Sequence, residues 1–168
     1  MDISNNKSKR VQTAMKLFDR GFKCSQAVLV AFEDLHHMDY EVALKLSSSF
    51  GAGMGKLGEV CGAVTGMFMV AGLLYGFSYP LNQDEINNHF ERIQELTNEF
   101  KSITGSILCV KYPSPNNCKD NSPCMEIKKN NSCCQQISST ELVGIATSIM
   151  ENYISKNPPI LRSQKAES

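Results

Sequence analysis

Residues 60–77 read Val60-Cys-Gly-Ala-Val-Thr-Gly-Met-Phe-Met-Val-Ala-Gly-Leu-Leu-Tyr-Gly-Phe77 and contain no charged side chain. A helix needs about 20 apolar residues to cross a bilayer, so this stretch is almost long enough. Its Gly62/Gly66 and Gly72/Gly76 pairs have a spacing that allows close helix contact in membranes. However, four glycines lower its hydrophobicity and no basic cluster flanks it. We therefore expect a buried central helix rather than a membrane span.

Amphipathic segments on both sides of this stretch supply helices that can cover it. Their apolar residues recur at helical spacing, and capping or terminating residues mark several of their ends. The expected helices are residues 6–20, residues 24–35, a helix capped by Asp39 with Val42, Ala43, Leu46 and Phe50 inward, a helix from Asn82 to Gly105, and a helix capped by Ser138. No internal repeat and no strand pattern is found. The expected fold class is therefore all-α, a single-domain helical bundle with a buried apolar central helix.

Two regions fall outside this helical pattern. Residues 111–131 are rich in Pro, Asn, Ser and Lys, which predicts an irregular Cys-containing loop near the C-terminal third of the chain. The tail over residues 158–168 is expected to be disordered. Residues 1–157 are therefore expected to form one helical domain.

Another segment, Gly51-Ala-Gly-Met-Gly-Lys-Leu-Gly58, has four glycines in eight residues. It is not a phosphate-binding loop of the Gly-Lys-Ser/Thr type, because Leu57 follows Lys56 and no strand pattern precedes the segment. Glycine tolerates positive φ angles. The segment is therefore predicted to be a tight passage between two helices.

Charge and composition narrow the function classes. The 168 residues carry 17 basic and 17 acidic side chains, a formal net charge of zero, and no tryptophan. That balance gives no electrostatic reason to expect nucleic acid or an anionic membrane as partner. The polar N-terminus lacks the apolar region of a signal peptide, so a cytoplasmic location is expected. Seven cysteines in a reducing compartment point first to metal binding or thiol chemistry.

Five of the seven cysteines fall near predicted helix starts. Cys24 begins one helix, Cys61 begins the central helix, Cys109 follows a possible N-cap at Ser106, and Cys133 and Cys134 lie in a potential first turn after Ser132. Backbone N–H groups at a helix N-terminus stabilise a thiolate and lower its pKa. Thiolates attack disulfides and bind soft metals. If these helix ends converge, the cysteines form one redox or metal-binding centre.

A simpler interpretation of each cysteine stays open. Free cysteine often behaves as a small buried apolar residue. The chain has no Cys-x-x-Cys pair, so it contains neither a thioredoxin motif nor a standard zinc ribbon. The cysteines do avoid the middles of the amphipathic stripes, which favours a shared role for the set.

Three motifs resemble a known family. Phe22-Lys-Cys-Ser-Gln-Ala-Val28, Phe50-Gly-Ala-Gly-Met-Gly55 and Gly58-Glu-Val-Cys-Gly-Ala-Val-Thr-Gly66 are similar to segments of the redox-active proteins named for their C-GCAxxG-C-C signature. Gly105-Ser-Ile-Leu-Cys109 resembles the region of the third signature cysteine. The resemblance covers roughly residues 16–153. The order here is Cys61-Gly62-Ala63, whereas the signature has Gly-Cys-Ala, so the alignment rests on the cysteine and the small residues.

The resemblance implies a set of site residues. It assigns Cys24, Cys61 and Cys109 to the first three signature cysteines and Cys134, next to Cys133, to the fourth. Cys118 and Cys124 lie in an additional excursion, which is either a second metal site or a loop. The redox role of this family implies a redox partner protein. Genes of the family are often found near transporter genes, which implies association with a transporter.

Small residues follow Cys61 on one face of the central helix. Gly62, Ala63 and Gly66 would let a cofactor, a second helix end or a partner thiol approach the backbone closely. The same small face would also suit tight packing against a neighbouring helix. Both interpretations stay open, and in the first these three residues are cofactor-binding.

Three functions remain in view. In the first, Cys24, Cys61, Cys109 and Cys134 are the metal ligands of a four-thiolate centre that binds an iron–sulfur cluster and transfers electrons. In the second, the protein is a cofactor-free thiol–disulfide redox protein in which Cys24 and Cys61 are catalytic. In the third, zinc stabilises a non-catalytic binding module.

Overall fold

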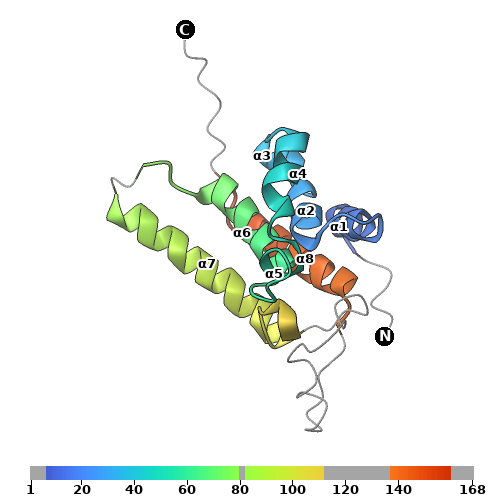
Figure 1. Ribbon diagram of the computed structural model, residues 1–168. Helices are drawn as coiled ribbons and strands as arrows, with labels where there is room; N and C mark the ends of the chain where they lie inside the picture. The colour runs from blue at the N-terminus through green and yellow to red at the C-terminus, as the bar shows by residue number, and fades with distance from the viewer. Residues whose placement is uncertain (1–6, 80–81, 112–136, 160–168) are drawn as a thin grey trace.

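Helices make up the regular structure of this protein apart from one isolated bridge, in a computed structural model that describes residues 7–79, 82–111 and 137–159. The helices are α1 (Lys9–Asp19), α2 (Cys24–Val30), α3 (Glu33–His36), α4 (Tyr40–Ser48), α5 (Gly51–Met54), α6 (Gly62–Tyr75), α7 (Gln83–Thr104), the 3-10 turn η2 (Cys109–Lys111) and α8 (Ser139–Lys156). The all-α prediction is confirmed (Figure 1). The predicted Cys-containing loop and most of the predicted tail lie outside the described residues.

Side-chain caps fix several helix ends. Asp39 accepts a backbone N–H of the first turn of α4, and Asn82 does the same for α7. At α8, Ser138 accepts the N–H of Glu141, and the Glu141 carboxylate accepts the N–H of Ser138. These contacts satisfy backbone donors that have no partner within the helix. At the other end of α7, Gly105 has a φ of +84°, a left-handed conformation that glycine adopts without strain.

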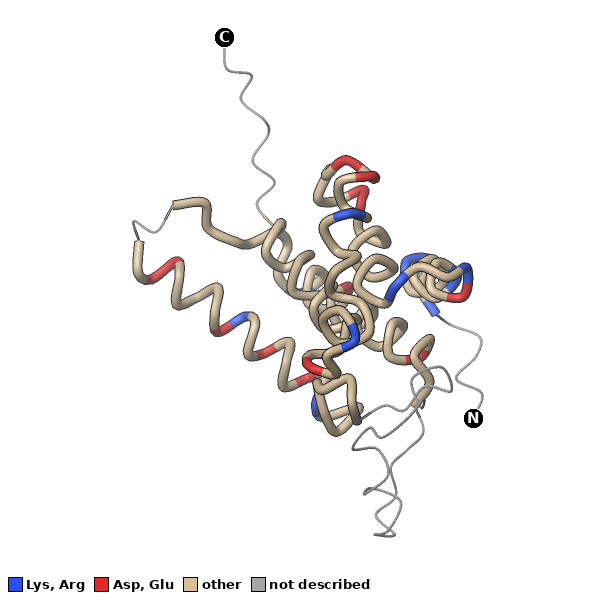
Figure 2. The backbone as a smooth tube through the Cα atoms, viewed as in Figure 1, with Lys and Arg blue, Asp and Glu red and all other residues tan. Residues whose placement is uncertain are grey.

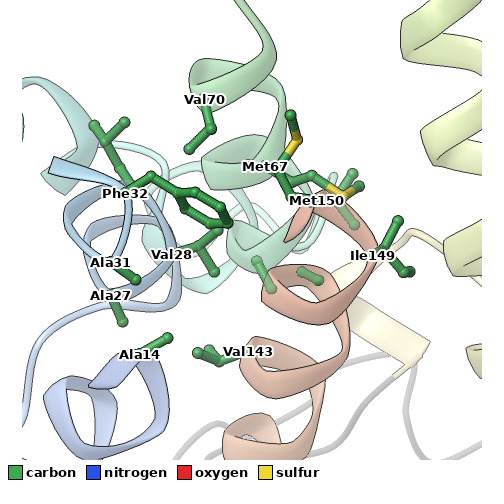
Figure 3. Packing of buried hydrophobic residues seen from close by; sticks show 14 of the residues in the cluster. Ala14, Ala27, Val28, Ala31, Phe32, Met67, Val70, Val143, Ile149 and Met150 are labelled. Carbon is green, nitrogen blue, oxygen red and sulfur yellow. The ribbon is translucent and has the colours of Figure 1, made fainter. Parts of the chain in front are cut away.

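The core lies between α2, α6 and α8 (Figure 3). Phe32, Met67, Val143 and Met150 are fully buried there, and α1 packs against α8 on the outside of the bundle (Figure 1). The first half of α6 is buried, whereas Leu73 near its end is exposed. Among the described helices, none is long and apolar enough to cross a membrane.

The helix predicted over residues 24–35 is two helices, α2 and α3, separated at Ala31 and Phe32. Arg10 of α1 fits against this break. Its guanidinium donates to the Ala31 carbonyl at 2.6 Å, pairs with both carboxylate oxygens of Asp34 at 2.5 and 2.9 Å, and lies 4.7 Å from the centre of the Phe32 ring. A carbonyl left without a helical partner by the break is therefore satisfied by a charged donor from another helix.

The predicted inward face of α4 is wrong in two positions. Val42 and Leu46 are 52% and 51% exposed, whereas Ala43 and Ser47 are buried. The reason is close packing against α2, where the buried Ser25 hydroxyl donates to the Ser47 carbonyl at 2.7 Å. A large apolar side chain on the contact face would hold the two backbones apart, so the small residues face inward.

Candidate functional site

The three described cysteines all lie at helix starts, as predicted. Cys24 is the first residue of α2, Cys61 is the N-cap of α6, and Cys109 is the first residue of η2. All three are free thiols. Cys61 is 2% exposed, and the other two are partly buried. The fold thus takes cysteines that are far apart in the sequence and puts each at the point where a helical element begins.

A short two-stranded ribbon joins the segments that carry Cys61 and Cys109. Val60 and Leu108 form an antiparallel bridge. On one side of it the Cys61 N–H donates to the Ile107 carbonyl at 2.7 Å, and on the other the Cys109 N–H donates to the Glu59 carbonyl at 2.7 Å. In this pattern residues 59, 61, 107 and 109 share one face, because side chains alternate along a strand. Cys61 and Cys109 are diagonal neighbours on that face, about 7–8 Å apart between Cα atoms.

Cys24 reaches the same place from α2. A Cβ atom added to Gly62, the residue after Cys61, would lie 3.1 Å from the Cys24 Cβ and 3.3 Å from the Ser25 nitrogen. The absence of a side chain at Gly62 therefore lets the start of α2 approach the start of α6. The Cys24 thiol lies in the electrostatic field of both other thiols, since ionisation of either raises the pKa of Cys24. The three thiols thus converge.

A left-handed turn borders this group of thiols. Consecutive residues 52 to 56 have positive φ angles, including the non-glycine residues Ala52 at +54°, Met54 at +64° and Lys56 at +71°. Such angles are unfavourable for residues with a Cβ. The turn contacts the site through Gly53, whose added Cβ would lie only 2.5 Å from the Cys109 Cβ. The predicted passage between helices is therefore a strained segment that abuts Cys109.

Burial decides the protonation of the thiols. It raises the pKa of Cys24 from 9.0 to about 12 and that of Cys61 from 9.0 to about 11, and it also raises the pKa of Cys109. The N–H groups of Ala63 and Val64 at the start of α6 favour the Cys61 thiolate, but their effect is smaller. The expected lowering of the thiol pKa by helix ends is therefore wrong for the metal-free protein, because desolvation of the charged form outweighs it.

The small face of α6 is occupied by α2. An added Cβ at Gly66 would lie 2.8 Å from the Ser25 carbonyl oxygen and 2.9 Å from the Val28 Cβ. Ala63 is fully buried. Tight helix packing, one of the two interpretations of these small residues, is therefore present. Binding of a cofactor by Gly62, Ala63 and Gly66 stays a prediction.

The other predicted site residues lie outside the described residues: Cys118, Cys124, Cys133 and Cys134. Within the described ranges, no three His, Cys, Asp or Glu side chains are arranged to hold a single metal ion. The four-thiolate ligand set therefore stays a prediction.

Sequence reasoning missed two features of the site. One is the Val60–Leu108 bridge, which is too short to give an alternating pattern. The other is the contact between Gly53 and Cys109. The glycines of residues 51–58 were the available signal for the second feature, since a glycine is required wherever another residue approaches the backbone this closely.

Comparison with known proteins matches the chain to a protein family. A family model described as "Putative redox-active protein (C_GCAxxG_C_C)" matches residues 22–151, a range that holds all seven cysteines of the chain. Searches of curated proteins and of solved structures gave no match.

Proposed function

Since the chain belongs to the C_GCAxxG_C_C family of redox-active proteins, we propose that Cys24, Cys61, Cys109 and Cys134 hold an iron–sulfur cluster that transfers electrons. The observation that carries this proposal is the convergence of three free thiols from α2, α6 and η2. Cysteine thiolates are the usual ligands of such clusters, and four are the usual number. The family match supports a redox role, and the cofactor is our inference.

The spacing of Cys61 and Cys109 disfavours a disulfide between these two thiols. A disulfide requires Cα atoms about 4.4–6.8 Å apart, whereas the ribbon geometry puts Cys61 and Cys109 about 7–8 Å apart. A single zinc ion draws each of its sulfurs to within about 2.3 Å of one point. A cluster has several metal atoms, so its ligands can be farther from one another.

The chain's own residues set the environment of the bound group. Cys61 supplies a ligand from the buried end of α6, and the N–H groups of Ala63 and Val64 favour its thiolate form. Hydrogen bonds to sulfur and burial are the means by which a protein sets a cluster potential. Because the pKa values of the free thiols are raised, the thiols must release protons when they bind the cluster. Cluster assembly is therefore expected to become more favourable as pH rises.

A second candidate is thiol–disulfide exchange between Cys24 and Cys61. The field of Cys61 has a larger effect on the pKa of Cys24 than the field of Cys109 has, which makes these two thiols the favoured pair. In this reaction, two thiols would pass two electrons and two protons to a disulfide oxidant, which becomes two thiols. However, a pKa of about 12 at Cys24 leaves little thiolate at neutral pH to attack a disulfide. The cluster is therefore the better-supported proposal.

A redox titration separates the two candidates. Protein purified without oxygen is titrated with dithionite. We expect a visible absorption band that bleaches after uptake of one electron per centre. Absorption should be absent from the Cys61→Ser variant. A colourless protein that takes up two electrons per molecule, with loss of two free thiols on reoxidation, would instead establish the disulfide reaction.

A further inference from the structure

Charge is strongly segregated in this molecule although its formal net charge is zero. The segment 7–23, which covers α1 and extends to the N-cap of α2, has six basic residues and one acidic residue. Helix α7 has five acidic residues and two basic ones. Figure 2 shows Lys and Arg on α1 and Asp and Glu along α7, on opposite sides of the view. The molecule therefore presents two faces of opposite sign.

Four cations of the basic side form what we call the basic stripe: Lys9, Lys16, Arg20 and Lys23. All four are exposed, and none forms an ion pair or side-chain hydrogen bond with any residue that the structure describes. Lys16 follows Lys9 by seven positions and Arg20 follows Lys16 by four, so they share one face of the helix. The face extends about 16 Å from Lys9 to Arg20.

The basic stripe leads to the thiol centre. Lys23 directly precedes Cys24 in the sequence. The carbon stem of Lys23 packs on Gly51, where an added Cβ would lie 2.6 Å from the Lys23 Cβ. The cationic surface therefore ends at the edge of the group formed by Cys24, Cys61 and Cys109.

We infer that the basic stripe docks a redox partner protein through an acidic surface on that partner, and so brings the partner's redox group to the Cys24 side of the centre. This inference rests on the proposed redox function. Complementary charge accelerates encounter and fixes orientation, which is what two proteins that exchange electrons require. Exposed cations that form no internal ion pair can pair with the partner's carboxylates without any internal ion pair being broken.

A membrane and a nucleic acid are less suitable partners for the basic stripe. Interfacial helices bury an apolar face in the membrane, but Val11, Ala14 and Leu17 of α1 are buried in the protein and its other apolar residues, Met15 and Phe18, are partly buried. Nucleic-acid proteins usually combine a basic surface with base-reading or stacking groups. The exposed face of α1 contains only Gln12 and Thr13 between Lys9 and Lys16.

The test measures binding of two small redox proteins of opposite charge to the full-length chain purified without oxygen. The probes are an acidic [2Fe–2S] ferredoxin and a basic cytochrome c, with affinities measured by calorimetry at about 20 mM and 300 mM salt, which bracket weak and strong screening. We expect the ferredoxin to bind, with an affinity at least about tenfold lower at the higher salt. No ferredoxin binding, or equal binding of cytochrome c, overturns the inference.

Charge variants locate the docking surface. Lys16→Glu together with Arg20→Glu should weaken ferredoxin binding about tenfold. The matched control, Lys101→Glu with Lys156→Glu, changes net charge equally at exposed positions on α7 and α8 and should change affinity less than about twofold. Equal weakening by both pairs would mean that only net charge matters. The milder Lys16→Gln/Arg20→Gln pair, with helicity checked by circular dichroism, should show a smaller loss in the same direction.

Further controls separate this inference from the proposed function. The Cys61→Ser variant should bind ferredoxin like the unmodified chain but accept no electron. Electron uptake without ferredoxin binding would overturn the docking inference alone, and binding without any redox change would overturn the function alone. Vesicles with phosphatidylserine and a DNA duplex should bind more weakly than ferredoxin. Tighter binding to either would overturn the assignment to a protein partner.

Discussion

At the residue scale, glycines decide how closely the elements around the thiols approach one another. Gly66 packs on the backbone of α2, whereas an added Cβ at Gly72, on the same helix, meets nothing within 4 Å. We expect Gly66→Ala to lower the free energy of unfolding by about 1–3 kcal/mol, because the methyl group has no room. Gly72→Ala should raise it by up to about 1 kcal/mol, since alanine favours helix. Urea denaturation measures both, and equal effects would contradict the packing described here.

A second glycine pair separates backbone strain from contact with the site. Gly53 and Gly55 have φ angles of +70° and +68°, so alanine at either position costs about 1–2 kcal/mol in strain. Only at Gly53 would the new Cβ collide with Cys109; at Gly55 the nearest atom is 3.6 Å away. We therefore predict that Gly53→Ala loses the redox centre and Gly55→Ala keeps it, as judged by the visible spectrum. Loss in both variants would show that strain alone is responsible.

The buried thiols predict a pH dependence of stability in the reduced, metal-free protein. Folding raises the pKa of Cys24 from 9.0 to about 12, so the folded state holds this proton more tightly than the unfolded state. The resulting stabilisation is fully present below about pH 9 and is lost as pH rises toward 12. The melting temperature should fall more steeply between pH 9 and 11 in the unmodified chain than in Cys24→Ser. Parallel curves for the two proteins would contradict the burial of this thiol.

At the scale of the elements, local signals in the sequence predict helix ends well. Asp39, Asn82, Ser138 and Gly105 mark the ends of α4, α7 and α8 because capping depends on hydrogen bonds within one turn. The side of α4 that faces the core was not predictable in the same way. Its inward side is set by close packing of Ser47 on α2, a tertiary contact that outweighs the preference of Val42 and Leu46 for burial.

The candidate site, too, was predictable only where it depends on local sequence signals. The positions of Cys24, Cys61 and Cys109 at helix starts follow from local patterns. Their protonation does not, because the pKa shifts arise from desolvation by distant elements. The Gly53–Cys109 contact likewise depends on tertiary geometry, although the glycine content of residues 51–58 signals that some close approach exists.

Arg10 ties α1 to the break between α2 and α3, and this junction gives a prediction of its own. Arg10→Met should lower the free energy of unfolding by about 1–3 kcal/mol, because the Ala31 carbonyl and Asp34 lose their charged donor. The neighbouring Lys9→Met removes an equal charge from an exposed position and should have an effect within about 0.5 kcal/mol. Chemical denaturation of the two variants provides the measurement. Comparable losses would mean that the junction does not depend on Arg10.

At the scale of the whole molecule, the bundle serves to bring distant cysteines to one end of its central helix. Cys24 and Cys109 lie on elements far apart in the sequence, yet Cys24 packs beside Gly62 and Cys109 raises the pKa of Cys61. The same fold puts the basic stripe beside this end and the acidic α7 on another side (Figure 2). Redox chemistry and partner recognition would then lie next to each other on one surface.

The measurement that tests the central claim most directly is the iron and acid-labile sulfide content of protein purified without oxygen. It should be made on the unmodified chain, on Cys61→Ser and on Cys118→Ser. We predict stoichiometric iron and sulfide with a brown colour in the unmodified chain and in Cys118→Ser, and neither in Cys61→Ser. Colourless protein without iron, or equal loss in both variants, would contradict a cluster held by Cys24, Cys61, Cys109 and Cys134.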